Sequence, residues 1–153
     1  MKDKLKVVVI EDDEDWMNDL CELLNEQFDA ELEKFYSFEV AEKRLLNTKM
    51  DFDLLVTDVF SSWASKRTTG FYFAKLVSGQ GIPVIVVTGV DGFAEDAFRQ
   101  IDVLDAFHKD RFSGAAFILA IRDWLNKRKN GDGNEPPKPP DHPSQGKYPD
   151  GFI

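Results

Sequence analysis

The sequence predicts a doubly wound α/β fold, in which helices cover both faces of one five-stranded parallel sheet. Short runs rich in β-branched residues recur along the chain, and segments with helical periodicity separate them. The strongest runs are apolar at every position, which is typical of parallel strands that are buried on both faces. Strands and helices repeat every 20 to 30 residues or so, roughly the length of a strand–helix–strand unit.

Five segments are expected to form the strands. The first is Leu5–Ile10, in which residues 7–10 form a continuous β-branched run. Residues 31–36 alternate between polar and apolar, which suits a more exposed strand near the sheet edge. The third strand covers 53–58, the fourth runs from Ile82 to Thr88, and a short fifth strand covers 103–107.

Helical patterns fill the intervals between these strands. The first helix is expected from about residue 16 to 27, Ser37 caps the second, and the third follows Gly70. A fourth helix is expected over 93–100, and Ser113 caps the last. The apolar residues expected on these helices are Val40, Ala41, Leu45 and Leu46 in the second, Phe71, Phe73, Ala74, Leu76 and Val77 in the third, and Phe117, Ile118, Ile121, Trp124 and Leu125 in the last.

Composition indicates one globular domain followed by a tail. Of the 153 residues, 42% are hydrophobic and 31% are charged, as in ordinary globular domains. Six of the seven prolines lie beyond residue 129, where they rule out a helix or a central strand. The expected division is therefore a folded domain over 1–128 and a flexible Pro/Gly-rich tail over 129–153, with a proline-rich docking motif as the alternative use of the tail.

Charge and cysteine content exclude several classes of protein. The net charge of −9 would repel phosphates, so a direct nucleic-acid or membrane-binding surface is not expected. Cys21 is the only cysteine, which excludes a disulfide framework and a thiolate zinc cluster, and its place in an amphipathic pattern predicts a core position. The start of the chain does not resemble a signal peptide, and no segment has transmembrane length. We therefore expect a cytoplasmic protein.

Polar residues stand where four of the predicted strands end. Glu11 and Asp12 follow the first strand, Asp58 ends the third, Thr88 ends the fourth and Lys109 follows the fifth. Right-handed crossovers bring the carboxyl ends of all the strands to one edge of the sheet, where open α/β sheets bind ligands. Taken alone, Asp58 could equally be a polar residue that simply ends a strand. The following acids at 13–15 are interpreted as a solvated helix start.

Three carboxylates, a hydroxyl and an ammonium at one edge favour phosphoryl chemistry. Two carboxylates about 4 Å apart repel by roughly 4 kcal/mol at an effective dielectric near 20, and a hard divalent cation relieves this repulsion. Mg²⁺ suits oxygen ligands and completes its shell with a phosphate oxygen. Lys109 would neutralise a phosphoryl oxygen and Thr88 would donate a hydrogen bond to another. The Asp58 carboxylate could then attack phosphorus and form an acyl phosphate.

Residues 4–128 resemble the response-regulator receiver domain of two-component signalling, the CheY-like fold. The matching segments are 7–13, 53–58 and 83–89, together with Lys109. The resemblance implies a flavodoxin/CheY-like sheet with strand order 2-1-3-4-5. It implies a non-enzymatic receiver that is phosphorylated by a histidine kinase or phosphotransfer protein and then acts on a downstream protein partner.

The resemblance also assigns roles to single residues. It implies that Glu11 and Asp12 are the acidic metal pair, that Asp58 is the phosphoacceptor, and that the Phe60 main-chain carbonyl is a further ligand of the Mg²⁺ ion. It implies that Thr88 and Lys109 sense the phosphoryl group.

The sequence departs from the receiver pattern in the switch region. Ala106 stands where an aromatic residue is usual, three residues before the lysine, and Asp110 follows Lys109 where proline is usual. A cis bond before a non-proline residue costs about 2.5–4 kcal/mol, so a trans bond is expected there. The loop over 59–69 is also longer than usual, and its Trp63 is either a docking residue or packed on the third helix.

Two alternatives remain beside the phosphorylated receiver. The first is a receiver-like interaction module that no longer uses phosphorylation, because the switch is incomplete. The second, more distant one is an aspartyl phosphatase, suggested by the spacing of Asp13 and Asp15. If the chain is phosphorylated, the apolar Phe60 and Val90 beside Asp58 and Thr88 should orient water poorly and make the phosphorylated form long-lived. His108 and His142 are not expected to be phosphodonors or metal ligands.

Overall fold

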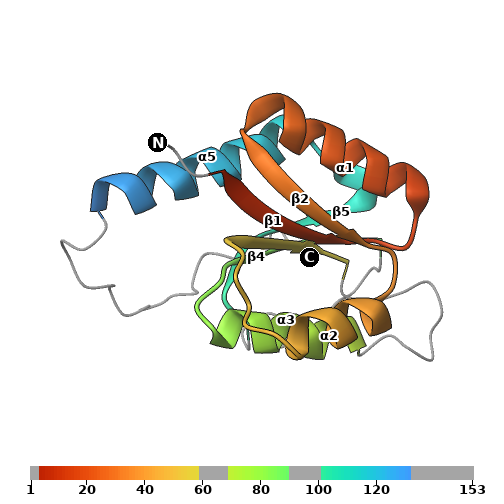
Figure 1. Ribbon diagram of the computed structural model, residues 1–153. Coiled ribbons are helices and arrows are strands. Elements are labelled where there is room, and N and C mark those ends of the chain that lie inside the picture. The colour runs from red at the N-terminus through yellow and green to blue at the C-terminus, as the bar shows by residue number, and fades with distance from the viewer. Residues whose placement is uncertain (1–3, 59–68, 90–100, 132–153) are drawn as a thin grey trace.

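Five strands and their intervening helices make up the described part of the chain (Figure 1). The computed structural model describes residues 4–58, 69–89 and 101–131. The elements in chain order are β1 (Leu5–Ile10), α1 (Glu14–Gln27), β2 (Ala30–Phe35), α2 (Phe38–Leu46), β3 (Leu54–Thr57), α3 (Thr69–Gly79), β4 (Val84–Thr88), β5 (Val103–His108), the short 3₁₀ turn η2 (Lys109–Arg111) and α5 (Gly114–Gly131). The helix expected over 93–100 lies outside the described residues.

The strands form one parallel sheet in the order β2-β1-β3-β4-β5. The predicted fold class and strand order are therefore confirmed. Ile10, the last residue of β1, pairs with Phe35 on one side and with Thr57, the last residue of β3, on the other. Because these strands end in register, the residues that follow β1 and β3 leave the sheet side by side.

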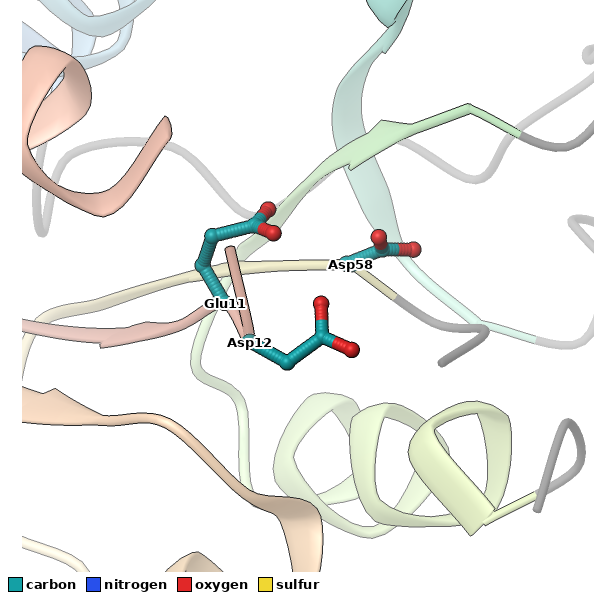
Figure 2. A group of neighbouring side chains, drawn as sticks. All are labelled: Glu11, Asp12 and Asp58. Atoms are coloured by element: carbon teal, nitrogen blue, oxygen red, sulfur yellow. The ribbon is translucent and has the colours of Figure 1, made fainter. Parts of the chain in front are cut away.

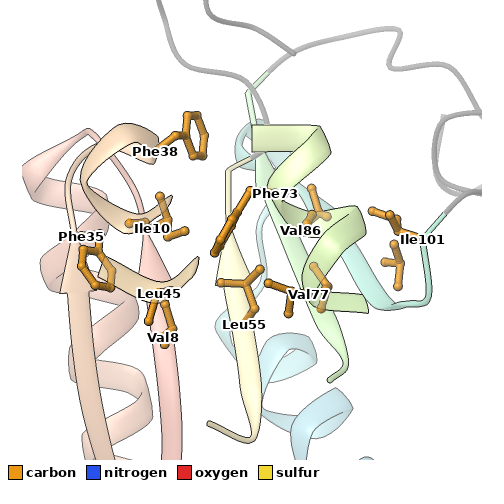
Figure 3. Packing of buried hydrophobic residues seen from close by; sticks show 14 residues of the cluster. Val8, Ile10, Phe35, Phe38, Leu45, Leu55, Phe73, Val77, Val86 and Ile101 are labelled. Carbon is orange, nitrogen blue, oxygen red and sulfur yellow. The ribbon is translucent and has the colours of Figure 1, made fainter. Parts of the chain in front are cut away.

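Helices cover both faces of the sheet: α1 and α5 lie on one face, and α2 and α3 lie on the other (Figure 1). Alternate residues of each central strand supply the two cores, because successive side chains of a strand point to opposite faces. Val7 and Val9 pack with the α1/α5 side, whereas Val8 and Ile10 pack with the α2/α3 side (Figure 3). β3 and β4 follow the same alternation. Burial on both faces explains the continuous apolar run in each of these strands.

Side chains cap three helices, and two of these caps, Ser37 and Ser113, are the ones the sequence predicts. Asp13, Ser37 and Ser113 each accept a hydrogen bond of 3.1 Å from a backbone N–H in the first turn of α1, α2 and α5 respectively. Such caps satisfy donors that have no partner within the helix, and each is worth about 1 kcal/mol. Cys21 is buried in α1, as expected.

Some of the apolar residues expected on α2 and α3 lie on the solvent side of these helices. Val40 is 54% exposed, Leu46 is 46% exposed and Leu76 is 49% exposed. The buried face of α2 consists of Phe38, Ala41 and Leu45. Apolar residues outnumber the positions that one helix face can bury, so the packing against the sheet decides which of them face the core.

Some element boundaries also differ from expectation. α1 begins at Glu14 and β2 at Ala30, slightly earlier than expected, and β4 begins at Val84, later than expected. The delay in β4 follows from the turn before it, where Gly81 has a φ of +86° and the Ile82 N–H still bonds to a carbonyl of α3. α5 continues to Gly131, beyond the expected boundary at 128. None of the described helices is long and apolar enough to cross a membrane.

Candidate functional site

Glu11, Asp12 and Asp58 converge at the carboxyl edge of the sheet (Figure 2). Each offers a carboxylate oxygen, and these oxygens lie within 4.8 Å of one another. The three side chains differ in exposure: Glu11 is 1% exposed and Asp58 is 6% exposed, whereas Asp12 is exposed. Two of the carboxylates are thus almost fully removed from water, and the third opens the group to solvent.

Backbone hydrogen bonds fix this convergence. The Glu11 N–H donates to the Phe35 carbonyl at 3.0 Å, and the Asp58 N–H donates to the Ile10 carbonyl at 3.1 Å. Both bonds continue the sheet ladder by one residue beyond the strands, so the two acids occupy neighbouring positions on rigid backbone. The Asp13 N–H donates to Glu11 Oε2 at 3.0 Å, which orients the Glu11 carboxylate.

Lys109 closes the site from the end of β5. Its Nζ donates to Glu11 Oε2 at 3.0 Å and to Asp58 Oδ2 at 3.3 Å. The side chain is only 15% exposed, so both ion pairs are shielded from solvent. One ammonium therefore bridges the two buried carboxylates.

The electrostatics of the site reflect this burial. Desolvation raises the pKa of Glu11 to about 7, although Lys109 and the Asp13 N–H act in the opposite direction. Burial alone would lower the pKa of Lys109, but the carboxylates of Glu11 and Asp58 outweigh it, and the pKa is raised. Lys109 therefore stays protonated at neutral pH, whereas Glu11 is poised between its two protonation states.

The donor set fits a hard divalent cation. When all four groups are ionised, three carboxylates face a single ammonium, which leaves an excess of negative charge. Glu11 Oε1 is buried and accepts no hydrogen bond from any of the described residues. A buried carboxylate oxygen without a donor is costly, and a cation would satisfy it. Oxygen-only ligands with one open side suit Mg²⁺, which keeps several waters in its shell.

Of two further residues predicted for the site, the structure describes Thr88 but not Phe60. Thr88 ends β4, the strand next to β3, and is buried at the same edge as Asp58. Phe60, expected to offer its main-chain carbonyl, lies outside the described residues, as do Val90 and Trp63. The structure thus brings together Glu11, Asp12, Asp58 and Lys109 from the predicted set, with Thr88 on the adjacent strand.

The residues around Lys109 have a local structure of their own. Ala106 is partly buried against the α2/α3 core. The Asp110 N–H donates to His108 Nδ1 at 3.0 Å and begins the turn η2. No cis peptide bond occurs within the described ranges, in agreement with the expected trans bond.

Sequence reasoning missed one contact of the site. The ring centroid of Trp16, in the first turn of α1, lies 5.2 Å from the Lys109 ammonium. The helical pattern identified residue 16 only as the approximate start of the first helix. The available signal was its position one turn after the acids, because a helix that follows β1 begins at the edge where β1 ends.

Comparison with known proteins identifies the fold. No family model and no curated protein matches the sequence. Solved structures do match it. The response regulatory domain of protein mrkE from Klebsiella pneumoniae has a TM-score of 0.67 at 19% identity and covers 82% of this chain and 98% of its own. A response regulator receiver domain from Francisella has a TM-score of 0.62 at 23% identity and covers 82% and 99%.

A third structure, the BeF3-activated DrrB receiver domain, has a TM-score of 0.61 at 18% identity and covers 81% of this chain and 99% of its own. These similarities extend over almost the whole length of each matched domain. Together with the strand order, they show that this chain has the fold of response-regulator receiver domains.

Proposed function

We propose that this chain is a signalling receiver that is phosphorylated on Asp58 in a Mg²⁺-dependent reaction. The observation that carries the proposal is the Lys109 ammonium bridging two buried carboxylates, with a third, exposed carboxylate beside them. A structural ion pair needs one carboxylate per ammonium. The additional acids are explained by a second cation, so Glu11, Asp12 and Asp58 would hold Mg²⁺ together with the Phe60 carbonyl.

The proposed reaction is transfer of a phosphoryl group from a phosphohistidine of a histidine kinase or phosphotransfer protein. An Asp58 oxygen attacks phosphorus, the phosphorus–nitrogen bond of the donor breaks, and the leaving imidazole takes up a proton. Lys109 compensates the charge on one phosphoryl oxygen, and Thr88 donates a hydrogen bond to another. Bound Mg²⁺ would supply charge neutralisation of the transferred group.

The product is an acyl phosphate that adds negative charge to the carboxyl edge of the sheet. Such a charge can shift a protein between two surface states and so change which partner it binds. We propose that the output is binding to a downstream protein in the cytoplasm, and not catalysis.

The test is incorporation of phosphate from a small phosphodonor such as acetyl phosphate, followed by intact-mass measurement. We expect a mass gain of one phosphoryl group that requires Mg²⁺ and is lost in Asp58→Ala. Asp51→Ala is the matched control, because Asp51 lies before the same strand, at the opposite edge, with its side chain 79% exposed. A mass gain that persists in Asp58→Ala would contradict the assignment of the phosphoacceptor.

The packing of Ala106 favours a second candidate, a receiver-like module that binds its partner without phosphorylation. Ala106 is held against the α2/α3 core and has no aromatic side chain to reposition when Asp58 changes. Under this alternative, Mg²⁺ and a phosphodonor produce no mass gain on the wild-type chain. The same experiment therefore separates the two candidates.

A further inference from the structure

The ring of Trp16 is a third contact of the Lys109 ammonium, beside the carboxylates of Glu11 and Asp58. Lys109 Nζ lies 3.0 Å from Glu11, 3.3 Å from Asp58 and 5.2 Å from the Trp16 ring centroid. This last distance is within the range of cation–π attraction, which strengthens as the partners lose contact with water. The Lys109 side chain is 15% exposed, so the contact is largely desolvated.

Independent contacts fix the ring in this place. The backbone N–H of Trp16 donates to the capping carboxylate of Asp13 at 3.1 Å, which fixes the first turn of α1. The ring then meets Phe112, just after η2, edge to face, with centroids 5.3 Å apart and an interplanar angle of 86°. Phe112 in turn packs on Phe107 and Phe117. The Trp16 backbone is thus held in the first turn of α1, and its ring contacts Phe112 as well as Lys109.

We infer that Trp16 is a positioning residue, whose ring holds the Lys109 ammonium at the gap between Glu11 and Asp58. A lysine carries its charge on a flexible four-carbon stem with a large rotamer entropy. The two carboxylates attract the ammonium. The indole face over which it lies limits its movement further, so the ammonium stays where a phosphoryl oxygen on Asp58 would arrive. The effect on phosphoryl transfer rests on the proposed function, whereas the Trp16–Lys109 contact itself does not.

The alternative is a purely structural role, in which Trp16 only covers the edge of the α1/α5 core, against which it is partly buried. The chain offers a matched control for such a packing role. Trp124 in α5 also packs on that core, and the guanidinium carbon of Arg128 lies 5.1 Å from its ring centroid. The two tryptophans therefore share burial and a cation contact, but only Trp16 contacts a residue of the acidic site.

The first test is a double-mutant cycle on the unfolding equilibrium, using Trp16→Leu, Lys109→Met and the double variant. We expect a coupling of roughly 2- to 30-fold in the unfolding constant, the range of a cation–π contact of about 0.5–2 kcal/mol. If the effects of the two single variants on the unfolding constant simply multiply in the double variant, the residues are not coupled and the inference is overturned. This cycle needs no phosphorylation, so it decides the contact even if the proposed function fails.

The second test is the rate of Mg²⁺-dependent phosphorylation by acetyl phosphate. Trp16→Leu should slow it about 5- to 30-fold, and Trp16→Phe, which restores an aromatic face, should recover most of the rate. Trp124→Leu should keep the wild-type rate. Equal slowing in Trp16→Leu, Trp16→Phe and Trp124→Leu would show that only general packing was lost and would also overturn the inference. Absence of phosphorylation in the wild-type chain would instead contradict the proposed function.

Discussion

The ammonium of Lys109 meets the carboxylate of Glu11 at 3.0 Å, although the two residues are 98 positions apart in the sequence. The Glu11 side chain of this pair is fully buried and that of Lys109 is 15% exposed. Lys6 and Asp51 form an ion pair of similar type at 3.6 Å, but their side chains are 46% and 79% exposed. The two pairs allow the effect of burial on an ion pair to be measured within one small domain.

Replacing Lys109 by methionine should destabilise the protein strongly. At pH 8 the change leaves two buried carboxylates without their cation, and breaking a buried pair costs about 3–5 kcal/mol. Urea unfolding should show a loss of about 3 kcal/mol, with part of the penalty relieved by protonation of Glu11. Lys6→Met is the matched control and should cost less than about 1 kcal/mol, because its pair is exposed. Similar losses in both variants would contradict the importance of burial.

The stability of the metal-free protein should fall as pH rises from about 4.5 to about 7. Over this interval the folded state keeps a proton on Glu11, because its pKa is raised from 4.5 to about 7, whereas the unfolded state releases it. The stabilisation is fully present below pH 4.5 and is lost as pH passes 7. Its upper limit is roughly 3 to 4 kcal/mol, from about 1.4 kcal/mol per pKa unit.

Glu11→Gln isolates this effect, because glutamine does not titrate. The difference in unfolding free energy between wild type and Glu11→Gln should change over that pH interval. Glu14→Gln, which alters an exposed carboxylate in the first turn of α1, should keep the wild-type pH dependence. Parallel curves for wild type and Glu11→Gln would refute the raised pKa.

Chelation of divalent cations should lower the stability of the wild-type protein at pH 8. A ligand that binds only the folded state stabilises it by about 2.7 kcal/mol at a concentration 100 times its dissociation constant. Asp12→Ala should abolish most of the Mg²⁺-dependent rise in Tm, since it removes the exposed carboxylate of the site, and should leave the Tm in EDTA nearly unchanged. Asp15→Ala removes a nearby exposed acid and should retain the response to Mg²⁺. An undiminished response in Asp12→Ala would argue against this metal site.

Phe60→Asn should speed loss of the phosphoryl group from phosphorylated Asp58. An amide can hydrogen-bond to an attacking water, whereas a phenyl ring cannot. The measurement is the decay of the phosphorylated mass after removal of the phosphodonor. Phe60→Leu keeps an apolar side chain and should decay at the wild-type rate. An unchanged rate in Phe60→Asn would reject the role of this residue in water access.

Local sequence patterns were sufficient to predict most of the fold. The continuous apolar runs of β1, β3 and β4 reflect burial on both faces, and Asp13, Ser37 and Ser113 mark helix starts through hydrogen bonds within a few residues. The positions of Glu11, Asp58 and Lys109 at strand ends follow from the parallel topology alone. These features depend on neighbours in sequence or on a rule that applies to every parallel sheet.

Features that depend on the packing of distant elements could not be predicted. Val40 and Leu76 are as apolar as their buried neighbours, and only the docking of α2 and α3 determines that they face solvent. The Trp16–Lys109 contact requires the relative placement of α1 and β5, which no local pattern encodes. The raised pKa of Glu11 likewise arises from burial by the surrounding fold and not from the sequence around it.

β2 lies at one end of the sheet, so one of its edges has no neighbouring strand among the described residues. Open strand edges are where proteins aggregate, because another chain can add to the exposed backbone groups. Here the edge strand carries Glu31, Glu33 and Lys34. A second β2 laid against it would crowd the charged side chains of both copies and remove them partly from water, and that cost opposes self-association along this edge even at high protein concentration.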